Sequence, residues 1–438
     1  MIYRRTSSSL GNPRGWGTRS ILPILVLAAS LCGAQDKSKV IEDPNPPNTA
    51  AQQAKHYVVL VSLDGFRYDY AAKYGATNLK AMAARGASAP DGMIPSYPSL
   101  TFPNHYSIVT GLYPDHHGIV ANSFYDPARK AAYSYKNSTT TSDASWYSGT
   151  PLWVLAEEQG MRAAAFFWPS SDASIQGHPP SFFLAPYQDK FPDEERVEQV
   201  LAWLRLPPEK RPHFIALYYA DTDHAGHAYG PDAPETGQAV RHVDEMIGKL
   251  SDGIAASGLP VDLIVLADHG METLRGGWVM LDKWADLSQF ETCGTLLYAK
   301  SEADAQKAYQ SLSGASDTFK VYRRAKLPAE LHLGSNPREG DPVIVPTGPY
   351  PIKARDADSC GGSEPPPRGG HGYDPRAMPT MKAIFVAAGP DIRPGSTVAP
   401  FENVDVYPLI AGILGLPAGT VDGKIGALKG ILKAQPQD

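Results

Sequence analysis

Aspartates and histidines follow several short apolar runs of this chain, either directly or within a few positions. Residues placed in this way are Asp64, Asp221, Asp223, His224, His227, Asp268 and His269, and His371 lies in a glycine-rich loop before another run. Imidazole nitrogen and carboxylate oxygen together suit Zn²⁺ or a similar first-row ion. Because an open catalytic site needs about three protein ligands for each ion, the set predicts two ions. Two ions about 4 Å apart can stabilise the attacking and leaving oxygens of a phosphoryl displacement.

Each of these residues also has a purely structural interpretation. A single aspartate after a strand, such as Asp64, is often a helix N-cap or a turn residue. On spacing alone His224 competes equally with His227, and Asp221 competes with Asp223. The metal interpretation is favoured because all of these positions coincide with predicted strand ends, where open α/β sheets bind their ligands.

The segment Pro98–Ile119 and the residues just before it contain several hydroxyl groups that could supply a nucleophile. If Thr101 begins a helix, the backbone N–H groups of the first turn would face an anion. A neighbouring metal could lower the pKa of the hydroxyl and make it a stronger nucleophile. The pattern does not choose Thr101 over Ser96, Ser99 or Thr110, and a helix cap is an equal interpretation.

Short apolar runs are predicted to be the strands that position these side chains. The runs lie at residues 57–63, 163–167, 214–219, 263–267 and 383–387. Nearly continuous apolar runs of this length suit strands that are buried on both faces of a parallel sheet. Helical patterns occur at residues 79–85, 194–206, 238–250 and 404–414. The chain is therefore predicted to be an α/β protein with a mostly parallel central sheet and helices on both faces.

Residues 275–375 depart from this pattern and are predicted to form an irregular insertion over the sheet. Their second half is rich in glycine and proline, including three consecutive prolines at 365–367 and a glycine pair at 369–370. Long loops of this kind are usually functional or disordered.

The first 34 residues are predicted to be a signal peptide. A start with four arginines precedes an apolar run at 21–29, which ends in small residues at 32–34. The run is too short to span a bilayer comfortably, so no stable membrane span is expected after its removal; an uncleaved anchor is the alternative. We predict a signal peptide at 1–34, a linker at 35–55, a catalytic domain at 56–425 and a C-terminal tail at 426–438. The protein would be periplasmic or secreted.

Composition and charge exclude one class of partner. About 42% of the residues are hydrophobic and 20% are charged, which is ordinary for a globular protein. The net charge of -6 gives no reason to expect duplex nucleic acid, whose partners usually carry a basic surface. An exported protein could join Cys293 and Cys360 in a disulfide, but the sequence leaves open whether they are close enough. It also leaves the oligomeric state open.

Several long motifs around these residues occur together and in order. They are Thr-Phe-Pro-Asn-His-Tyr from Thr101, Val-Thr-Gly-Leu-Tyr-Pro from Val109, Asp-His-Ala-Gly-His from Asp223, Asp-His-Gly-Met from Asp268 and Gly-His-Gly-Tyr-Asp from Gly370. Together with Asp64, they closely resemble the nucleotide pyrophosphatase/phosphodiesterase family of the alkaline phosphatase superfamily, in its compact bacterial type. The resemblance covers nearly all of residues 56–425 and implies an alkaline-phosphatase-like fold.

The resemblance also implies roles for the candidate ligands and the nucleophile. Thr101 would be the nucleophile. One ion would be bound by Asp64, Asp268, His269 and the Thr101 oxygen. The other ion would be bound by Asp223, His227 and His371. The family pattern thus selects Asp223 and His227 over Asp221 and His224, and Zn²⁺ is the expected metal for both sites.

Substrate-binding positions follow from the same resemblance. Asn122, 21 residues after Thr101, would hold a phosphate oxygen together with the backbone N–H of Phe102. Phe102 and Tyr187 match aromatic positions that flank a nucleotide base. Stacking of a base on an aromatic ring is worth about 1–3 kcal/mol and tolerates any base. An ordinary half-buried tyrosine is the alternative interpretation of Tyr187.

The activity implied is hydrolysis of nucleotide phosphodiester and pyrophosphate bonds through a phosphothreonine intermediate, so that a nucleoside triphosphate gives the monophosphate and pyrophosphate. The partner would be a small-molecule nucleotide or phosphodiester. Monoesterases of the superfamily typically carry extra cations in the region of residues 167–172, which here contain no Lys or Arg. This favours a diesterase, because a monoanionic diester needs less positive charge. A phospholipid-headgroup or choline phosphodiesterase, or a phosphatase, is the alternative; a non-catalytic binding protein would be expected to lack a ligand or Thr101.

Overall fold

The computed structural model describes residues 39–356, 358, 360 and 366–433. The predicted signal peptide therefore lies outside the described residues, as do the first residues of the predicted linker and the last of the predicted tail. No helix in the described part of the chain combines the length and the hydropathy that a membrane-spanning segment needs.

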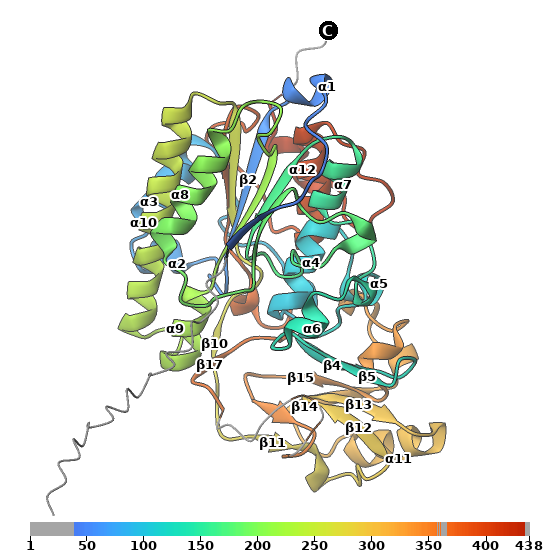
Figure 1. Ribbon diagram of the computed structural model, residues 1–438. Helices are drawn as coiled ribbons and strands as arrows, with labels where there is room; N and C mark the ends of the chain where they lie inside the picture. The colour runs from blue at the N-terminus through green and yellow to red at the C-terminus, as the bar shows by residue number, and fades with distance from the viewer. Residues whose placement is uncertain (1–38, 357, 359, 361–365, 434–438) are drawn as a thin grey trace, which may run out of the picture. The chain divides into compact units, whose positions relative to one another are not determined.

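Within the described residues, nine strands form one central sheet (Figure 1). In sheet order they are β1 (Lys39–Glu42), β7 (Phe182–Ala185), β6 (Ala163–Phe166), β8 (Phe214–Tyr219), β2 (Tyr57–Leu63), β9 (Val261–Leu266), β18 (Phe385–Ala388), β3 (Ala87–Ser88) and β19 (Ser396–Thr397). Strands β6, β8, β2 and β9 pair in parallel, whereas β18 runs antiparallel to β9. Every residue of β2, β8 and β9 is buried, which explains their continuous apolar sequences.

Helices cover both faces of this sheet, as predicted. Helices α3 (Thr77–Arg85), α8 (Asp193–Leu204) and α10 (Pro234–Ser257) lie on one face, and α4 (Thr101–Thr110), α7 (Leu152–Glu158) and α12 (Val406–Leu414) lie on the other (Figure 1). The helical patterns in the sequence correspond to α3, α8, α10 and α12. Helix α10 is longer than predicted at both ends. It begins with a proline in its first turn and ends before Gly258, which adopts a left-handed conformation.

The segment predicted to be a linker is attached to the sheet in its described part. Strand β1 pairs with β7 along all four of its residues, and all four of its side chains are exposed. A short helix, α1 (Ala50–Gln53), follows, capped by the Thr49 side chain. The buried Asn48 donates to the carbonyls of Pro208 and Arg211. Edge-strand pairing uses backbone groups alone, so no apolar pattern marked this strand in the sequence.

The stretch 275–375, predicted to be irregular, is more regular than expected. Its elements include β11 (Val279–Met280), β12 (Phe290–Cys293), β13 (Leu296–Ala299), α11 (Glu302–Leu312), β14 (Phe319–Tyr322), β15 (Val343–Pro346) and β16 (Ile352–Lys353). These six strands pair as three small two-stranded sheets, β11 with β16, β12 with β13 and β14 with β15. A separate buried cluster in this segment includes Leu281, Phe290 and Leu312. Strands of two to four residues are too short to show an alternating pattern, which is why the prediction was wrong here.

A disulfide closes one side of this insertion. Cys293, the last residue of β12, is bonded to Cys360, and their Cα atoms are 5.0 Å apart. The backbone N–H of Gly294 donates to the Asp358 carboxylate at 2.8 Å, and that of Ala354 donates to the Gly294 carbonyl at 2.8 Å. The turn after β12 is therefore held in place from two sides.

A carboxylate pair lies at the amino end of the central strands, opposite the end where ligands are expected. Asp262, the second residue of β9, is fully buried, and its Oδ1 accepts the Asp391 backbone N–H at 3.0 Å. Its Oδ2 has no hydrogen-bond partner among the described residues. His56 Nδ1 lies 2.6 Å from Asp391 Oδ2. Burial, and then the neighbouring Asp391 carboxylate, raise the pKa of Asp262 to about 8, against the opposing effects of the Asp391 backbone N–H and Lys433.

We expect this pair to make the protein less stable as pH rises. A carboxyl whose pKa is higher in the folded than in the unfolded state stabilises the fold fully below the unfolded value of about 4, and this contribution is lost as pH rises through about 8. The loss is at most about 1.4 kcal/mol for each pH unit. Asp262→Asn should remove this dependence, so that its melting temperature exceeds that of the wild type at pH 8. Asp252→Asn, on the exposed face of α10, is the matched control and should follow the wild type.

Candidate active site

The carboxyl ends of β2, β8 and β9 bring most of the predicted site residues together. Asp64 directly follows β2, and Asp268 follows β9 after a single alanine. Helix α9 (Asp221–Tyr229) begins just after β8 and places Asp223 and His227 one turn apart on the same side. All of these side chains therefore start from one edge of the parallel strands.

His371 reaches this edge because β18 runs in the opposite direction. The first residue of β18, Phe385, pairs with Leu266, the last residue of β9. A loop that leads into β18 therefore opens at the edge where β9 ends. The His371 ring stacks on the His269 ring, with centroids 3.6 Å apart and planes inclined by 14°.

Four predicted residues gather in a first cluster. His269 Nε2 lies 3.0 Å from Asp268 Oδ2 and 3.5 Å from Asp64 Oδ1. The Thr101 hydroxyl, at the first residue of α4, lies 3.4 Å from His269 Nε2. Thr101 thus begins a helix, and its hydroxyl makes no cap bond to that helix. The hydroxyl faces the first cluster instead.

The remaining three predicted ligands form a second cluster beside the first. His227 Nε2 and His371 Nε2 lie 3.4 and 3.6 Å from Asp223 Oδ1, and the two nitrogens are 3.1 Å apart. Asp64, Asp223 and His269 also offer ligand atoms that lie within 4.8 Å of one another, so the two clusters are contiguous. The competitors on spacing do not join this group of ligand atoms: Asp221 groups with Asp193 and His242, and His224 lies 3.6 Å from Asp189.

The three histidines are oriented by backbone carbonyls. Nδ1 of His227, His269 and His371 lies 2.8 Å from the Gly369 carbonyl, 2.9 Å from the Gly270 carbonyl and 2.9 Å from the Ser99 carbonyl, respectively. A carbonyl only accepts, so each Nδ1 carries the proton and each Nε2 presents a lone pair to the clusters. Two lone pairs 3.1 Å apart repel each other unless a cation lies between them and the nearby carboxylates.

Buried carboxylate oxygens that accept no hydrogen bond also indicate that cations bind in these clusters. Asp64 Oδ1, Asp223 Oδ1 and Asp268 Oδ2 are buried without a hydrogen-bond partner among the described residues. Burying an unpaired polar atom is costly, and burying an unpaired charge more so. The donor set, three carboxylates and three imidazoles with free Nε2 atoms, therefore fits two divalent cations.

Burial and the neighbouring charged groups shift the pKa values of two aspartates in opposite directions. Burial, followed by the nearby Asp268 and Asp223 carboxylates, raises the pKa of Asp64 well above its ordinary value. Burial alone would also raise the pKa of Asp268, but the neighbouring His269 and His105 lower it. Without a cation the carboxylates cannot all be ionised cheaply, and positive charge at this position would remove that conflict.

Two residues that hold the ligands were not found from the sequence. Tyr218 Oη donates to Asp64 Oδ2 at 2.5 Å. His105 Nδ1 lies 3.4 Å from Asp268 Oδ2 and 2.9 Å from the Thr101 carbonyl. Tyr218 is the fifth residue of β8, so its place near a strand end was visible, although tyrosine is also a common strand residue. His105, one helical turn after Thr101, was inside a motif but had no assigned role.

Asn122 lies beside the nucleophile, as the resemblance implied, but with a different partner. Its Oδ1 accepts the backbone N–H of Phe102 at 2.9 Å. That N–H, expected to contact phosphate, is therefore engaged in positioning the amide. The contact fixes the amide orientation and leaves the Nδ2 group of Asn122 to donate.

A cavity of about 660 Å³ opens onto the clusters. It is lined by Thr101 and by a set of aromatic residues, Phe102, Tyr135, Phe167, Trp168, Tyr187 and Tyr218. Phe102 and Tyr187 thus line the same cavity, and Tyr187 is 49% exposed. Residues 167–172 also line it, and they bring no cation. Lys136, which the sequence had not indicated, lines the cavity from another segment.

Comparison with known proteins gives one consistent match. A family model described as type I phosphodiesterase / nucleotide pyrophosphatase matches residues 58–374. Ectonucleotide pyrophosphatase/phosphodiesterase family member 1 of Mus musculus is 34% identical, across 92% of this chain and 46% of that protein. An uncharacterized pyrophosphatase/phosphodiesterase of Schizosaccharomyces pombe is 34% identical, across 84% of this chain and 79% of that protein. The chain spans about half the length of most of the curated relatives described, including a Crotalus durissus collilineatus venom phosphodiesterase.

Solved structures share the fold. Murine ectonucleotide pyrophosphatase/phosphodiesterase 5 has a TM-score of 0.79 and 28% identity, covering 86% of this chain and 100% of that chain. The same values hold for an inactive variant of that protein in complex with AMP.

Proposed function

Because the chain belongs to the type I phosphodiesterase / nucleotide pyrophosphatase family, we propose that it hydrolyses nucleotide phosphodiester and pyrophosphate bonds with Thr101 as the nucleophile. The observation that carries the proposal is the Thr101 hydroxyl, which lies at a helix N-terminus beside His269 and makes no cap bond. A hydroxyl that faces a ligand histidine at 3.4 Å, next to two contiguous ligand clusters, is suited to attack.

Two divalent ions, Zn²⁺ by the donor set, complete the site in this proposal. Asp64, Asp268, His269 and Thr101 would hold one, and Asp223, His227 and His371 would hold the other. Bound there, the ions would lower the pKa of the Thr101 hydroxyl and neutralise charge on the phosphoryl group.

The chain's own residues account for the remaining requirements. The Thr101 oxygen forms a bond to phosphorus while the bond from phosphorus to the leaving oxygen breaks, which gives a phosphothreonine diester. The Asn122 amide, fixed by the Phe102 N–H, donates to a non-bridging oxygen as its negative charge grows. The Thr101 proton leaves with the released group. Water then forms a bond to phosphorus while the bond from phosphorus to the Thr101 oxygen breaks, and one proton of that water goes to the Thr101 oxygen. A nucleoside triphosphate gives the monophosphate and pyrophosphate.

Nucleotide binding is assigned to the aromatic part of the 660 Å³ cavity. Phe102 lies next to the nucleophile in sequence, and Tyr187 lies on the loop after β7, so a base between them would be joined to a phosphate at Thr101. Stacking would supply about 1–3 kcal/mol for a base without selecting among bases.

We also propose that the protein is exported, to the periplasm or the medium. The basic and apolar start of the sequence has the layout of a signal peptide. The disulfide between Cys293 and Cys360 suits an oxidising compartment.

A substrate panel tests the proposed function. Purified protein loaded with zinc should convert ATP to AMP and pyrophosphate, read by chromatography. It should cleave a nucleotide diester faster than a choline phosphodiester, because only the former has a base for Phe102 and Tyr187. It should cleave a simple monoester slowest, because residues 167–172 provide no cation for a dianion. The highest kcat/KM for the monoester or the choline ester would contradict the proposal.

A further inference from the structure

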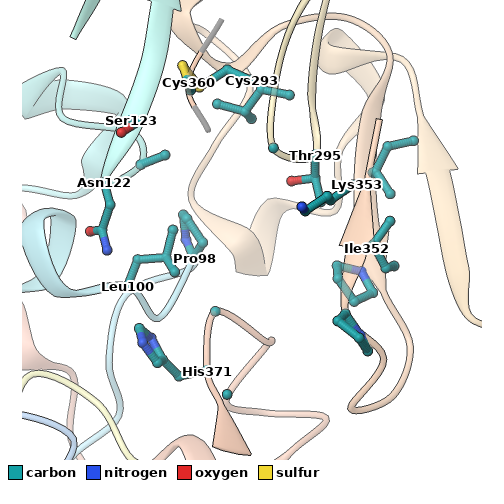
Figure 2. A pocket seen from close by; sticks show the side chains of 18 of the residues that line it. Pro98, Leu100, Asn122, Ser123, Cys293, Thr295, Ile352, Lys353, Cys360 and His371 are labelled. Carbon is teal, nitrogen blue, oxygen red and sulfur yellow. A yellow bond between two sulfur atoms is a disulfide. The ribbon is translucent and has the colours of Figure 1, made fainter. Parts of the chain in front are cut away.

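A second cavity, of about 490 Å³, adjoins the second cluster on the side of the insertion (Figure 2). Asn122 and His371 lie on one side of it, and Thr295, Ile352 and Lys353 of the insertion lie on the other. His227 also lines it. The cavity shares these catalytic-side residues with the first cavity, but Thr101, Asp64 and Tyr187 line only the first.

The walls of the second cavity are mainly apolar and aromatic. The apolar lining includes Pro98, Leu100, Trp278, Leu296, Tyr350 and Ile352. Lys353 is the single Lys or Arg among the described lining residues, and its Nζ lies 4.1 Å from the centre of the Trp278 ring. The carboxylates of Asp356 and Asp358 also line the cavity, as does Glu339, a side chain whose pKa burial raises to about 9. With more acidic than basic groups, these walls disfavour a polyanion and suit a ring-bearing organic group.

The position of the cavity relative to the nucleophile defines what enters it. In an in-line displacement the leaving oxygen departs on the side of phosphorus opposite the attacking oxygen. Thr101 attacks from the first cluster, so the leaving group departs toward the second cluster. The second cavity opens there, beside His227 and His371.

We propose that the second cavity binds the leaving group of the substrate and favours a nucleoside, as in a dinucleotide, over pyrophosphate. The proposal rests on the function proposed above and adds the identity of the leaving group. A base would pack against the Trp278 ring together with Lys353, whose Nζ lies 4.1 Å from the ring centre. The turn at Gly294–Thr295, held by the disulfide and by hydrogen bonds from both sides, gives a preformed wall.

Two substrates with the same reacting adenylyl group isolate this effect. Adenylyl-adenosine and ATP both release AMP, but the first loses adenosine and the second loses pyrophosphate. In Trp278→Ala, the ratio of kcat/KM for adenylyl-adenosine to kcat/KM for ATP should fall at least about tenfold relative to the wild type. Trp284→Ala is the matched control, since Trp284 lies in the same insertion, is 36% exposed and packs on Phe319 instead of lining the cavity. Its ratio should stay within about twofold of the wild type.

A second variant keeps the test decisive if Trp278→Ala does not fold. Thr295→Trp places a large ring in the cavity from a half-buried turn, and it should lower the same ratio. Melting curves identify the variants that are folded. An unchanged ratio in folded Thr295→Trp would overturn the proposal, because the leaving nucleoside would then lie elsewhere. Failure of the proposed function would give a different result, because the wild type itself would then not convert ATP to AMP and pyrophosphate.

Discussion

Thr101→Ala should lower kcat for a nucleotide phosphodiester by about 10⁴-fold or more, the loss usually seen when a covalent nucleophile is removed. The variant should fold like the wild type, because the Thr101 hydroxyl contacts His269 at 3.4 Å and caps no helix. Its content of bound metal should change little, since three other ligands of the first cluster remain. Steady-state kinetics and metal analysis of the same preparation measure both quantities. Thr101→Ser should recover part of the rate.

The control for this substitution lies in the same helix. Thr110, the last residue of α4, is buried, and its hydroxyl donates to the Tyr106 carbonyl within the helix. Thr110→Ala should therefore keep the wild-type kcat. Rapid quenching of the wild type during turnover should trap a nucleotide adduct on the peptide that contains Thr101. Wild-type activity in Thr101→Ala, or an adduct on another residue, would exclude Thr101 as the nucleophile.

His227→Ala should reduce bound metal from two ions to one per chain and lower kcat by at least about 100-fold. The expected loss exceeds the 10–100-fold that removal of a residue behind a ligand usually costs, because Nε2 of His227 itself faces the second cluster. The first cluster should keep its ion, because the ring that stacks on its ligand His269 is that of His371 and not that of His227. Elemental analysis after dialysis, with and without a chelator, gives the number of ions per chain.

His224→Ala separates this effect from a general disturbance of α9. His224 is an exposed residue of the same helix, three positions earlier; its Nδ1 lies 3.6 Å from Asp189, and it is not among the residues that offer a ligand atom to the second cluster. Its variant should retain two ions. If His224→Ala lost an ion and His227→Ala did not, the assignment of the second cluster would be wrong.

Much of this site was predictable because it follows from the arrangement of strands. The predicted α/β class with an alkaline-phosphatase-like fold is confirmed by the central sheet and by the matched structures. Asp64 and Asp268 follow apolar runs, and parallel strands bring such positions to a common edge. The choice of His227 over His224 came only from the resemblance, because both residues follow the same strand at similar distances.

Other features depend on contacts between distant segments, which periodicity does not encode. Tyr218 gains its role from the carboxylate of Asp64, 154 residues away in the chain. The second cavity exists only because the insertion packs beside Asn122 and His371. The direction of β18 was equally hidden, since an apolar run is the same in a parallel or an antiparallel strand.

That antiparallel direction has a consequence for how the molecule can change. Since Leu266 and Phe385 are paired neighbours, the chain leaves the sheet after β9 and returns at β18 through adjacent openings in the same rim. The insertion between them, apart from the stretches that carry Asp268, His269 and His371, can therefore be lengthened, shortened or exchanged without moving the strands that precede Asp64 and Asp223. Changes in the insertion can thus alter which leaving group is preferred, while the residues that cleave the bond stay in place.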